Sequence, residues 1–243
     1  MNSKKDNHIS IGKKHNKLII TIIIIHICFL IIKNSGITDI LKEKNLFYGV
    51  LINLIYQFIL IIMISLSMKQ YLNISLKKMK ANKISKNIKI IMAGVGIAFL
   101  SSFLVVIAEI IICSNTAIPQ NQSNINAYFI YYPVLAVIMS VIMAPFTEEI
   151  IYRYILLEFF RKYGNLCAVL VTGFLFGTMH MLSSFGNTNI WLFLFQWLKY
   201  CIPGIILGFI YTKYKNIWIN VSIHGTWNLI GAVMILTKIM LTK

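Results

Sequence analysis

The chain has 243 residues, of which 58% are hydrophobic and only 12% are charged, and its formal net charge is +16. Soluble domains have roughly 45–50% apolar and about 25% charged residues, whereas the mean hydropathy of this chain is +0.77. Because the apolar residues come in long runs, the composition excludes an ordinary soluble domain. It predicts an all-α fold, a polytopic transmembrane helical bundle.

The positive charge is concentrated in two segments beside apolar runs, before the first run and between the second and third. These lysines are Lys4, Lys5, Lys13, Lys14, Lys17, Lys69, Lys77, Lys78, Lys80, Lys83, Lys86 and Lys89. Basic loops that flank apolar spans follow the positive-inside pattern, which places the N-terminus in the cytoplasm. The pattern therefore predicts no nucleic-acid partner, and it predicts contact with anionic lipid at the basic loops.

Three apolar runs precede the middle of the chain. Leu18–Ile32 has a basic flank and no small-residue cleavage site, so we interpret it as a retained span, short for the bilayer at about 22 Å. Leu46–Met68 and Ile88–Cys113 follow it, and the uncharged loop Ser114–Asn126 is expected on the external side. Residues 1–126 are thus predicted to form N-terminal transmembrane helices with basic cytoplasmic segments.

The next apolar stretch, Ala127–Leu157, is interrupted by Pro145. One straight helix of this length would be about 46 Å long, so we predict a kink or break at Pro145. Three further spans complete the bundle: Asn165–Leu182, Ile190–Tyr211 and Ile217–Leu241. The total is seven or eight spans, depending on how the stretch around Pro145 is divided.

Two pairs of glycines recur at four-residue spacing within these later spans. They are Gly173 with Gly177, and Gly204 with Gly208. This spacing lets membrane helices approach each other closely.

Three charges lie within the apolar sequence APFTEEIIYRY, residues 144–154. Charged side chains inside a membrane are costly, and they persist when they are paired or functional. In a helix, Glu149 and Arg153 share a face, which predicts an ion pair between them. Glu148 points about 100° away and lacks that partner. It either faces a polar cavity or carries out proton chemistry.

Two histidines in later spans complete a candidate site with these carboxylates. His180 follows Phe176 by four residues, and His224 precedes Asn228 by four. A carboxylate and an imidazole can deprotonate a shared water, and a histidine and an asparagine can stabilise the resulting oxyanion. His26, in the first span, has no such neighbour and is interpreted as a packing residue.

A zinc site is the alternative use of the same residues. Glu148, His180 and His224 could hold Zn²⁺ and leave one position for water. The H-E-x-x-H pattern of zinc proteases is absent, and so is the G-x-S-x-G nucleophile elbow.

The depths of the two histidines set a condition on either use of these residues. In straight helices, His180 would lie about 22 Å and His224 about 10 Å from the cytoplasmic side. They must meet for either site to form.

Three motifs resemble those of one membrane-protein family. EEIIYR matches EExxxR, FGTMH matches FxxxH and HGTWN matches HxxxN/D. In this order, over about residues 127–232, they resemble the CPBP family, the CAAX-protease and bacteriocin-processing group also called Abi. The usual FRG after the glutamates is YRY here, so Tyr154 replaces a glycine.

The resemblance implies that residues 127–243 are a CPBP catalytic core, an all-helical intramembrane protease acting on a peptide or protein substrate. Glu148 and His180 would activate water, His224 and Asn228 would form the oxyanion site, and Glu149 and Arg153 would support them. The family was long classed with metalloproteases, but a metal-free glutamate mechanism is better supported. No cofactor is therefore expected, with Zn²⁺ as the alternative.

The sequence thus predicts an intramembrane endopeptidase. The Ile-, Lys- and Asn-rich composition suggests a bacterial protein, and hence the bacterial cytoplasmic membrane. A non-catalytic bacteriocin-immunity or scaffold protein of the same fold is the main alternative. A transporter ranks last because the polar residues cluster, with only Glu109, His26 and Lys199 lying apart.

Overall fold

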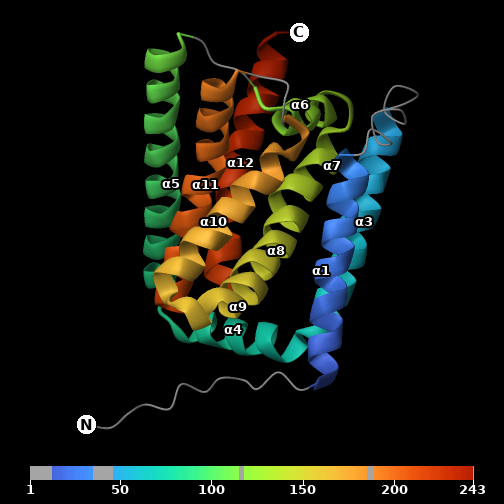
Figure 1. Cartoon of the computed structure of the whole chain (residues 1–243), viewed down its shortest axis with the longest axis vertical. Coiled ribbons are helices and arrows are strands. Elements are labelled where there is room, and N and C mark those ends of the chain that lie inside the picture. The colour runs from blue at the N-terminus through green and yellow to red at the C-terminus, as the bar shows by residue number, and fades with distance from the viewer. Residues whose placement is uncertain (1–12, 35–45, 115–117, 185–188, 243) are drawn as a thin grey trace.

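The computed structural model describes residues 13–34, 46–114, 118–184 and 189–242. These residues form a bundle of helices, and no strand occurs among them (Figure 1). The predicted all-α class is therefore confirmed. Lys4 and Lys5, assigned to the first basic segment, lie outside the described residues.

The helices of the first half are α1 (Lys13–Asn34), α3 (Leu46–Ser67), α4 (Lys69–Ala81), α5 (Ile84–Cys113) and α6 (Gln120–Tyr131). Those of the second half are α7 (Pro133–Val137), η1 (Ile138–Met143), α8 (Ala144–Glu149), η2 (Ile150–Leu157), α9 (Glu158–Phe160), η3 (Arg161–Tyr163), α10 (Asn165–Met181), η4 (Leu182–Ser184), α11 (Ile190–Tyr214) and α12 (Ile217–Leu241). Figure 1 shows the long helices standing beside one another, with α10 running obliquely and α4 lying across one end.

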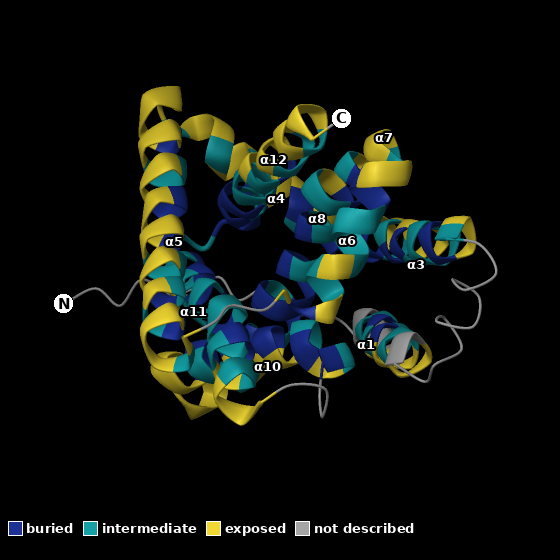
Figure 2. Ribbon diagram, turned by 90° about the horizontal axis from the view of Figure 1, so that it is seen from above, coloured by how far each residue is buried: buried dark blue, intermediate teal, exposed yellow. Residues whose placement is uncertain are grey.

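Six helices in the described residues are long and apolar enough to cross a membrane, and Leu18–Ile32 within α1 is a shorter apolar helix. Counted together they make seven, the lower of the two predicted numbers. The chain is therefore a multi-pass membrane protein. Seen from above, the outward face of α5 is exposed while its inner face is buried (Figure 2), as expected for a helix that faces lipid on one side.

A kink or break was predicted at Pro145, and no break occurs there. One continuous helix runs from Pro133 to Tyr163, and its segments α7 to η3 follow one another without a gap. The chain breaks instead at Tyr132, whose φ of −138° and ψ of 57° end α6. Pro133 follows at the first position of the new helix, where a missing N–H costs nothing.

Helix α4 was predicted only as part of a basic loop. It forms because its inner face packs on the bundle: Tyr71 stacks on Tyr154 with ring centroids 3.7 Å apart. The Trp218 indole donates to the Leu72 carbonyl at 3.0 Å. The tyrosine that stands where the family has glycine is therefore accommodated as a partner for α4.

Helices α10 and α11 pack closely at the predicted glycines. A Cβ at Gly177 would lie 3.0 Å from the Cys201 backbone nitrogen, and a Cβ at Gly173 would lie 3.0 Å from that of Ile205. In return, a Cβ at Gly204 would lie 3.2 Å from the Gly173 carbonyl oxygen. The expected close approach of these helices is confirmed.

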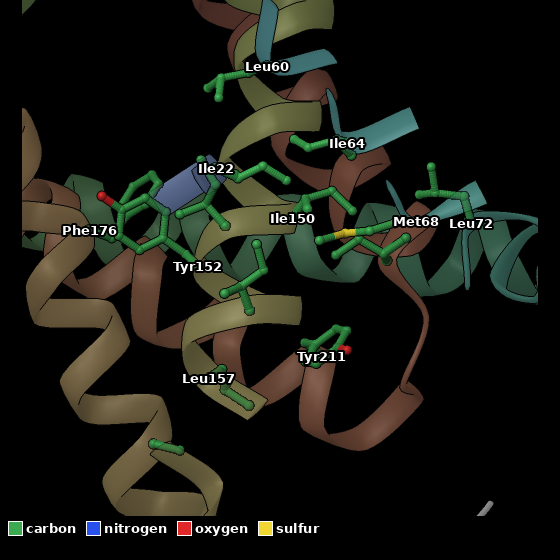
Figure 3. Close-up of a cluster of buried hydrophobic side chains, with 14 of the residues drawn as sticks. Ile22, Leu60, Ile64, Met68, Leu72, Ile150, Tyr152, Leu157, Phe176 and Tyr211 are labelled. Carbon is green, nitrogen blue, oxygen red and sulfur yellow. The ribbon is translucent and has the colours of Figure 1, made fainter. Parts of the chain in front are cut away.

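The largest buried apolar cluster joins the first helices to the long central helix. Ile22 of α1 and Leu60 and Ile64 of α3 are fully buried against Ile150 and Tyr152 of η2 (Figure 3). Helices α1 and α3 are therefore packed directly against the helix that carries the two glutamates.

Glu149 and Arg153 form an ion pair inside this core. Arg153 Nε lies 3.0 Å from Glu149 Oε2, and both side chains are 0% exposed. The predicted pairing along one helix face is confirmed. A second pair, Lys199 with Glu109, joins α11 to α5.

The glycine contacts predict the effect of one methyl group. Gly177→Ala pushes a Cβ against the α11 backbone, which cannot rotate away, and should lower stability by about 1–3 kcal/mol. Gly96→Ala is the matched control, since a Cβ there meets nothing within 4 Å, and it should change stability by less than about 1 kcal/mol. Thermal unfolding of the detergent-purified variants measures both. Equal midpoints for the two variants would contradict the close packing.

The buried ion pair predicts that Arg153→Ala lowers stability by about 3–5 kcal/mol, because it removes the guanidinium that is paired with the buried Glu149 carboxylate. The folded yield and the thermal midpoint should fall together. Arg161→Ala is the control: Arg161 pairs with Glu158 at 3.2 Å, but its side chain is 31% exposed, so the loss should stay below about 1 kcal/mol. Unchanged stability of Arg153→Ala would show that the pair contributes nothing.

Candidate active site

A cavity of about 460 Å³ lies between the first helices and the second half of the bundle. Residues from α1, α3, α5, α6, α8, α10, α11 and α12 contribute to its lining. Glu148 of α8, His180 of α10, and His224 and Asn228 of α12 all line it. The structure therefore brings all four predicted catalytic residues to one cavity.

His224 lies between the two glutamates. Its Nδ1 is 3.0 Å from Glu149 Oε1, and its Nε2 is 3.8 Å from Glu148 Oε2. Since a carboxylate can only accept, Nδ1 carries a proton and donates it to Glu149. Glu149 thus fixes the orientation of the His224 ring as well as pairing with Arg153.

Asn220 is a site residue that the sequence interpretation missed. Its side-chain nitrogen donates to Glu149 Oε2 at 3.2 Å and to the Leu207 carbonyl at 2.8 Å. A signal was present, because Asn220, His224 and Asn228 recur at four-residue spacing and so lie on one face of α12. Asn220 and His224 together place donors on both oxygens of the buried Glu149 carboxylate.

His180 is oriented by its own helix and by α11. Its Nδ1 lies 2.9 Å from the Phe176 carbonyl, four residues earlier, so Nδ1 is the donor and Nε2 is the acceptor in the neutral ring. The ring stacks on Tyr200 at a centroid distance of 4.6 Å and an interplanar angle of 19°.

The Phe176 ring lies at the centre of the site. Its centroid is 4.5 Å from that of His180 and 5.8 Å from that of His224. Tyr152 meets it edge-on at 5.3 Å, and the Arg153 guanidinium carbon lies 5.4 Å from its centroid. The two histidines therefore meet at one aromatic ring, and the separation in depth estimated for straight helices is closed by the oblique path of α10 (Figure 1).

Pro145 helps to place Asn228. The turn before it is π-helical, and the Ala144 amide donates to the Met139 carbonyl five residues back. In that register the partner of the Ser140 carbonyl would be the Pro145 amide, which has no hydrogen. Asn228 Nδ2 donates to that carbonyl at 2.7 Å, so one of its two N–H bonds is engaged and the other remains for a ligand.

His26, interpreted as a packing residue, has polar partners on other helices. His26 lines the same cavity as Glu148. Its Nδ1 is hydrogen-bonded to the Tyr56 hydroxyl, and its Nε2 lies 3.3 Å from the Tyr152 hydroxyl. The sequence could not show this, because the three residues lie on three separate helices far apart in the chain.

Zinc binding by Glu148, His180 and His224 is the alternative use of the site residues. In the ranges that the structure describes, no group of three or more His, Cys, Asp and Glu side chains is arranged to hold a metal ion. His224, one of the three ligands proposed for zinc, has its Nδ1 engaged by Glu149, and its Nε2 faces Glu148 at salt-bridge distance.

Comparison with known proteins gives two matches. Residues 130–230 match the family model described as type II CAAX prenyl endopeptidase Rce1-like. The chain is also 34% identical over 147 residues to UPF0177 protein YvdC of Lactococcus lactis subsp. lactis (strain IL1403), an alignment that covers 60% of this chain and 52% of that protein. This chain thus matches about half the length of that curated relative, whose name states no activity.

No solved structure gives a significant match. The family match, however, spans all three motifs and the three helices that carry them into the cavity. Residues 130–230 thus match the family model of Rce1-like type II CAAX prenyl endopeptidases, in agreement with the resemblance drawn from the motifs.

Proposed function

We propose that this protein is an intramembrane endopeptidase that hydrolyses a peptide bond with a water activated by Glu148 and His180. One observation carries the proposal: Glu148, His180, His224 and Asn228, from three helices, line a single cavity among apolar spans. The match of residues 130–230 to a CAAX endopeptidase family model supports it. We place the protein in the bacterial cytoplasmic membrane, with its N-terminus in the cytoplasm and its basic loops on anionic lipid.

The first step is activation of water. The Glu148 carboxylate accepts a proton from the water, and His180 Nε2, the accepting nitrogen of that ring, holds the water by a second hydrogen bond. The oxygen then attacks the carbonyl carbon of the scissile peptide, and the carbonyl becomes a tetrahedral oxyanion. The proton held on Glu148 passes to the leaving amine as the carbon–nitrogen bond breaks.

The second requirement is donors for the oxyanion. Asn228 has one N–H that is not used by Ser140, and it can donate to the developing charge. For His224 to donate from Nε2, its ring must carry both protons, because Nδ1–H is already directed to Glu149. Glu148 and Glu149, one on each side of the ring, are the groups that stabilise this doubly protonated form.

Glu149 and Arg153 act as positioning residues. Arg153 neutralises Glu149 along the helix, and Glu149 in turn orients His224. Arg153 also lies over the Phe176 ring, whose helix carries His180. A change at Arg153 would therefore disturb both histidines without removing a group that contacts substrate.

The mechanism predicts a graded loss of activity. Glu148→Gln and His180→Ala should abolish cleavage, because they remove the base and its partner. Asn228→Ala should lower the rate by about 10²–10³-fold, as for one lost oxyanion donor. The assay uses the protein in liposomes with internally quenched peptides, some bearing a prenylated cysteine and some unmodified. Glu158→Gln is the matched control. Glu158 pairs with Arg161 outside the cavity, and its side chain is 27% exposed, so this variant should retain activity.

The same variants separate the enzyme from a non-catalytic protein of this fold. A folded Glu148→Gln protein that cleaved peptides as fast as the wild type would overturn the proposed mechanism. A wild-type protein that confers bacteriocin immunity, and whose Glu148→Gln variant confers it equally, would instead favour the immunity or scaffold role.

Metal removal gives the second test of the mechanism. We expect dialysis against a chelator to leave cleavage unchanged, and elemental analysis of the active protein to find well below one zinc per chain. The expectation follows from the side-chain arrangement, because in the described ranges no group of three or more His, Cys, Asp and Glu side chains is placed to hold a metal ion. One zinc per chain, with activity lost on chelation and restored by zinc alone, would make Glu148, His180 and His224 metal ligands.

A further inference from the structure

A hydrogen-bonded group from three helices forms part of the cavity wall near Glu148. His26 of α1 lies between the hydroxyls of Tyr56 of α3 and Tyr152 of η2. Two of these residues precede residue 130, and so lie outside the segment that matches the family. His26 and Tyr56 line the cavity, whereas Tyr152 lies behind it. Figure 3 shows Tyr152 beside Phe176, with the α1 segment that carries Ile22 next to them.

Burial of Tyr152 determines where the proton of His26 lies. A neutral imidazole has one N–H donor and one bare nitrogen that accepts. Tyr152 is only 3% exposed, and within the described residues its hydroxyl has one hydrogen-bond partner, His26 Nε2. A buried hydroxyl hydrogen without an acceptor is costly, so Tyr152 donates to Nε2. The His26 proton is therefore on Nδ1.

This arrangement leaves the hydroxyl hydrogen of Tyr56 unused. Nδ1–H of His26 donates to the Tyr56 oxygen, and in the described part of the chain the Tyr56 hydroxyl makes no other hydrogen bond. Since Tyr56 lines the cavity, its hydrogen can be donated to a group that enters there.

The Tyr56 ring is held in place before any ligand arrives. Phe29 of α1 stacks on it with ring centroids 3.5 Å apart and planes 3° from parallel. His26 stacks against it at 6.2 Å and fixes the direction of its hydroxyl. Tyr56 and Glu148 line the same cavity, so the hydroxyl and the proposed base face one enclosed space. A donor that is already oriented loses little entropy on binding.

We propose that Tyr56 is a substrate-binding residue whose hydroxyl donates a hydrogen bond to a backbone carbonyl oxygen of the bound peptide, with His26 and Tyr152 as its positioning residues. The identity of the ligand rests on the proposed function. A carbonyl is the acceptor that fits, because an anionic group would be repelled by the nearby Glu148 carboxylate. The helices before residue 130 thus supply part of the substrate site.

Binding is measured separately from cleavage. In a Glu148→Gln background, fluorescence polarisation gives the dissociation constant of a labelled peptide. The peptide is the one that the wild type cleaves fastest. If the wild type cleaves none, it is the one that the Glu148→Gln variant binds most tightly. Adding Tyr56→Phe should weaken binding by about 3- to 10-fold, the loss of one neutral hydrogen bond. In the cleavage assay Tyr56→Phe should raise KM by a similar factor and leave kcat within about twofold.

The controls separate this role from a structural one. Tyr71→Phe removes a hydroxyl whose one hydrogen-bond partner among the described residues is Tyr211, at 3.1 Å and away from the cavity, and it should leave binding and cleavage unchanged. Nitrogen-15 spectra of histidine-labelled protein, with His26 assigned through His26→Gln, should show the Nδ1-protonated ring. Tyr152→Phe should remove the preference of His26 for protonation at Nδ1, and it should weaken peptide binding less than Tyr56→Phe does.

Three outcomes would overturn the inference: equal peptide affinity with and without the Tyr56 hydroxyl, an Nε2-protonated His26 ring, or no binding of any peptide in the set. Binding that depends on Tyr56, in a wild-type protein that cleaves nothing, would support the inference and overturn the endopeptidase proposal. The two proposals therefore fail separately.

Discussion

The buried carboxylate of Glu149 is the interaction on which the rest of the site depends. Its two oxygens accept from Arg153 on the same helix and from His224 and Asn220 on α12. A carboxylate with no exposed surface is tolerated in an apolar bundle only when such donors surround it. Because the donors come from two helices, satisfying the charge also fixes how η2 and α12 face each other across the cavity.

The two neighbouring glutamates therefore have different roles. Glu149 points into the core and is saturated with donors, whereas the side chain of Glu148 is 17% exposed and lines the cavity. The helix turns about 100° per residue, so adjacent residues face different surroundings. One carboxylate can then hold the architecture while its neighbour, facing the cavity, remains available for proton transfer.

Departures from regular α-helix also serve the site. The π-helical turn before Pro145 leaves the Ser140 carbonyl available to Asn228, and the turn that carries Arg153 is π-helical as well. Such turns are frequent at functional sites. Helix α10 runs obliquely (Figure 1), and its Phe176 ring lies 5.8 Å from the ring of His224 on α12. The glycines of α10 and α11 allow this close contact, since almost no space separates their backbones.

Local chemistry along the chain was sufficient to predict several features. The apolar runs predicted an all-α membrane bundle, because only helices satisfy their own backbone hydrogen bonds within one segment. Four-residue spacing predicted the Glu149–Arg153 pair, since neighbours on a helix face meet whatever the rest of the fold does. The three motifs likewise selected the residues that line the cavity and the family that the comparison found.

Only the tertiary structure decided how separate helices meet. The hydrogen bond from Asn228 to Ser140 and the group formed by His26, Tyr56 and Tyr152 each depend on contacts between residues far apart in the chain. No spacing in the sequence encodes them, because they depend on helix tilt and rotation within the bundle. In a membrane those are set by packing against neighbouring helices.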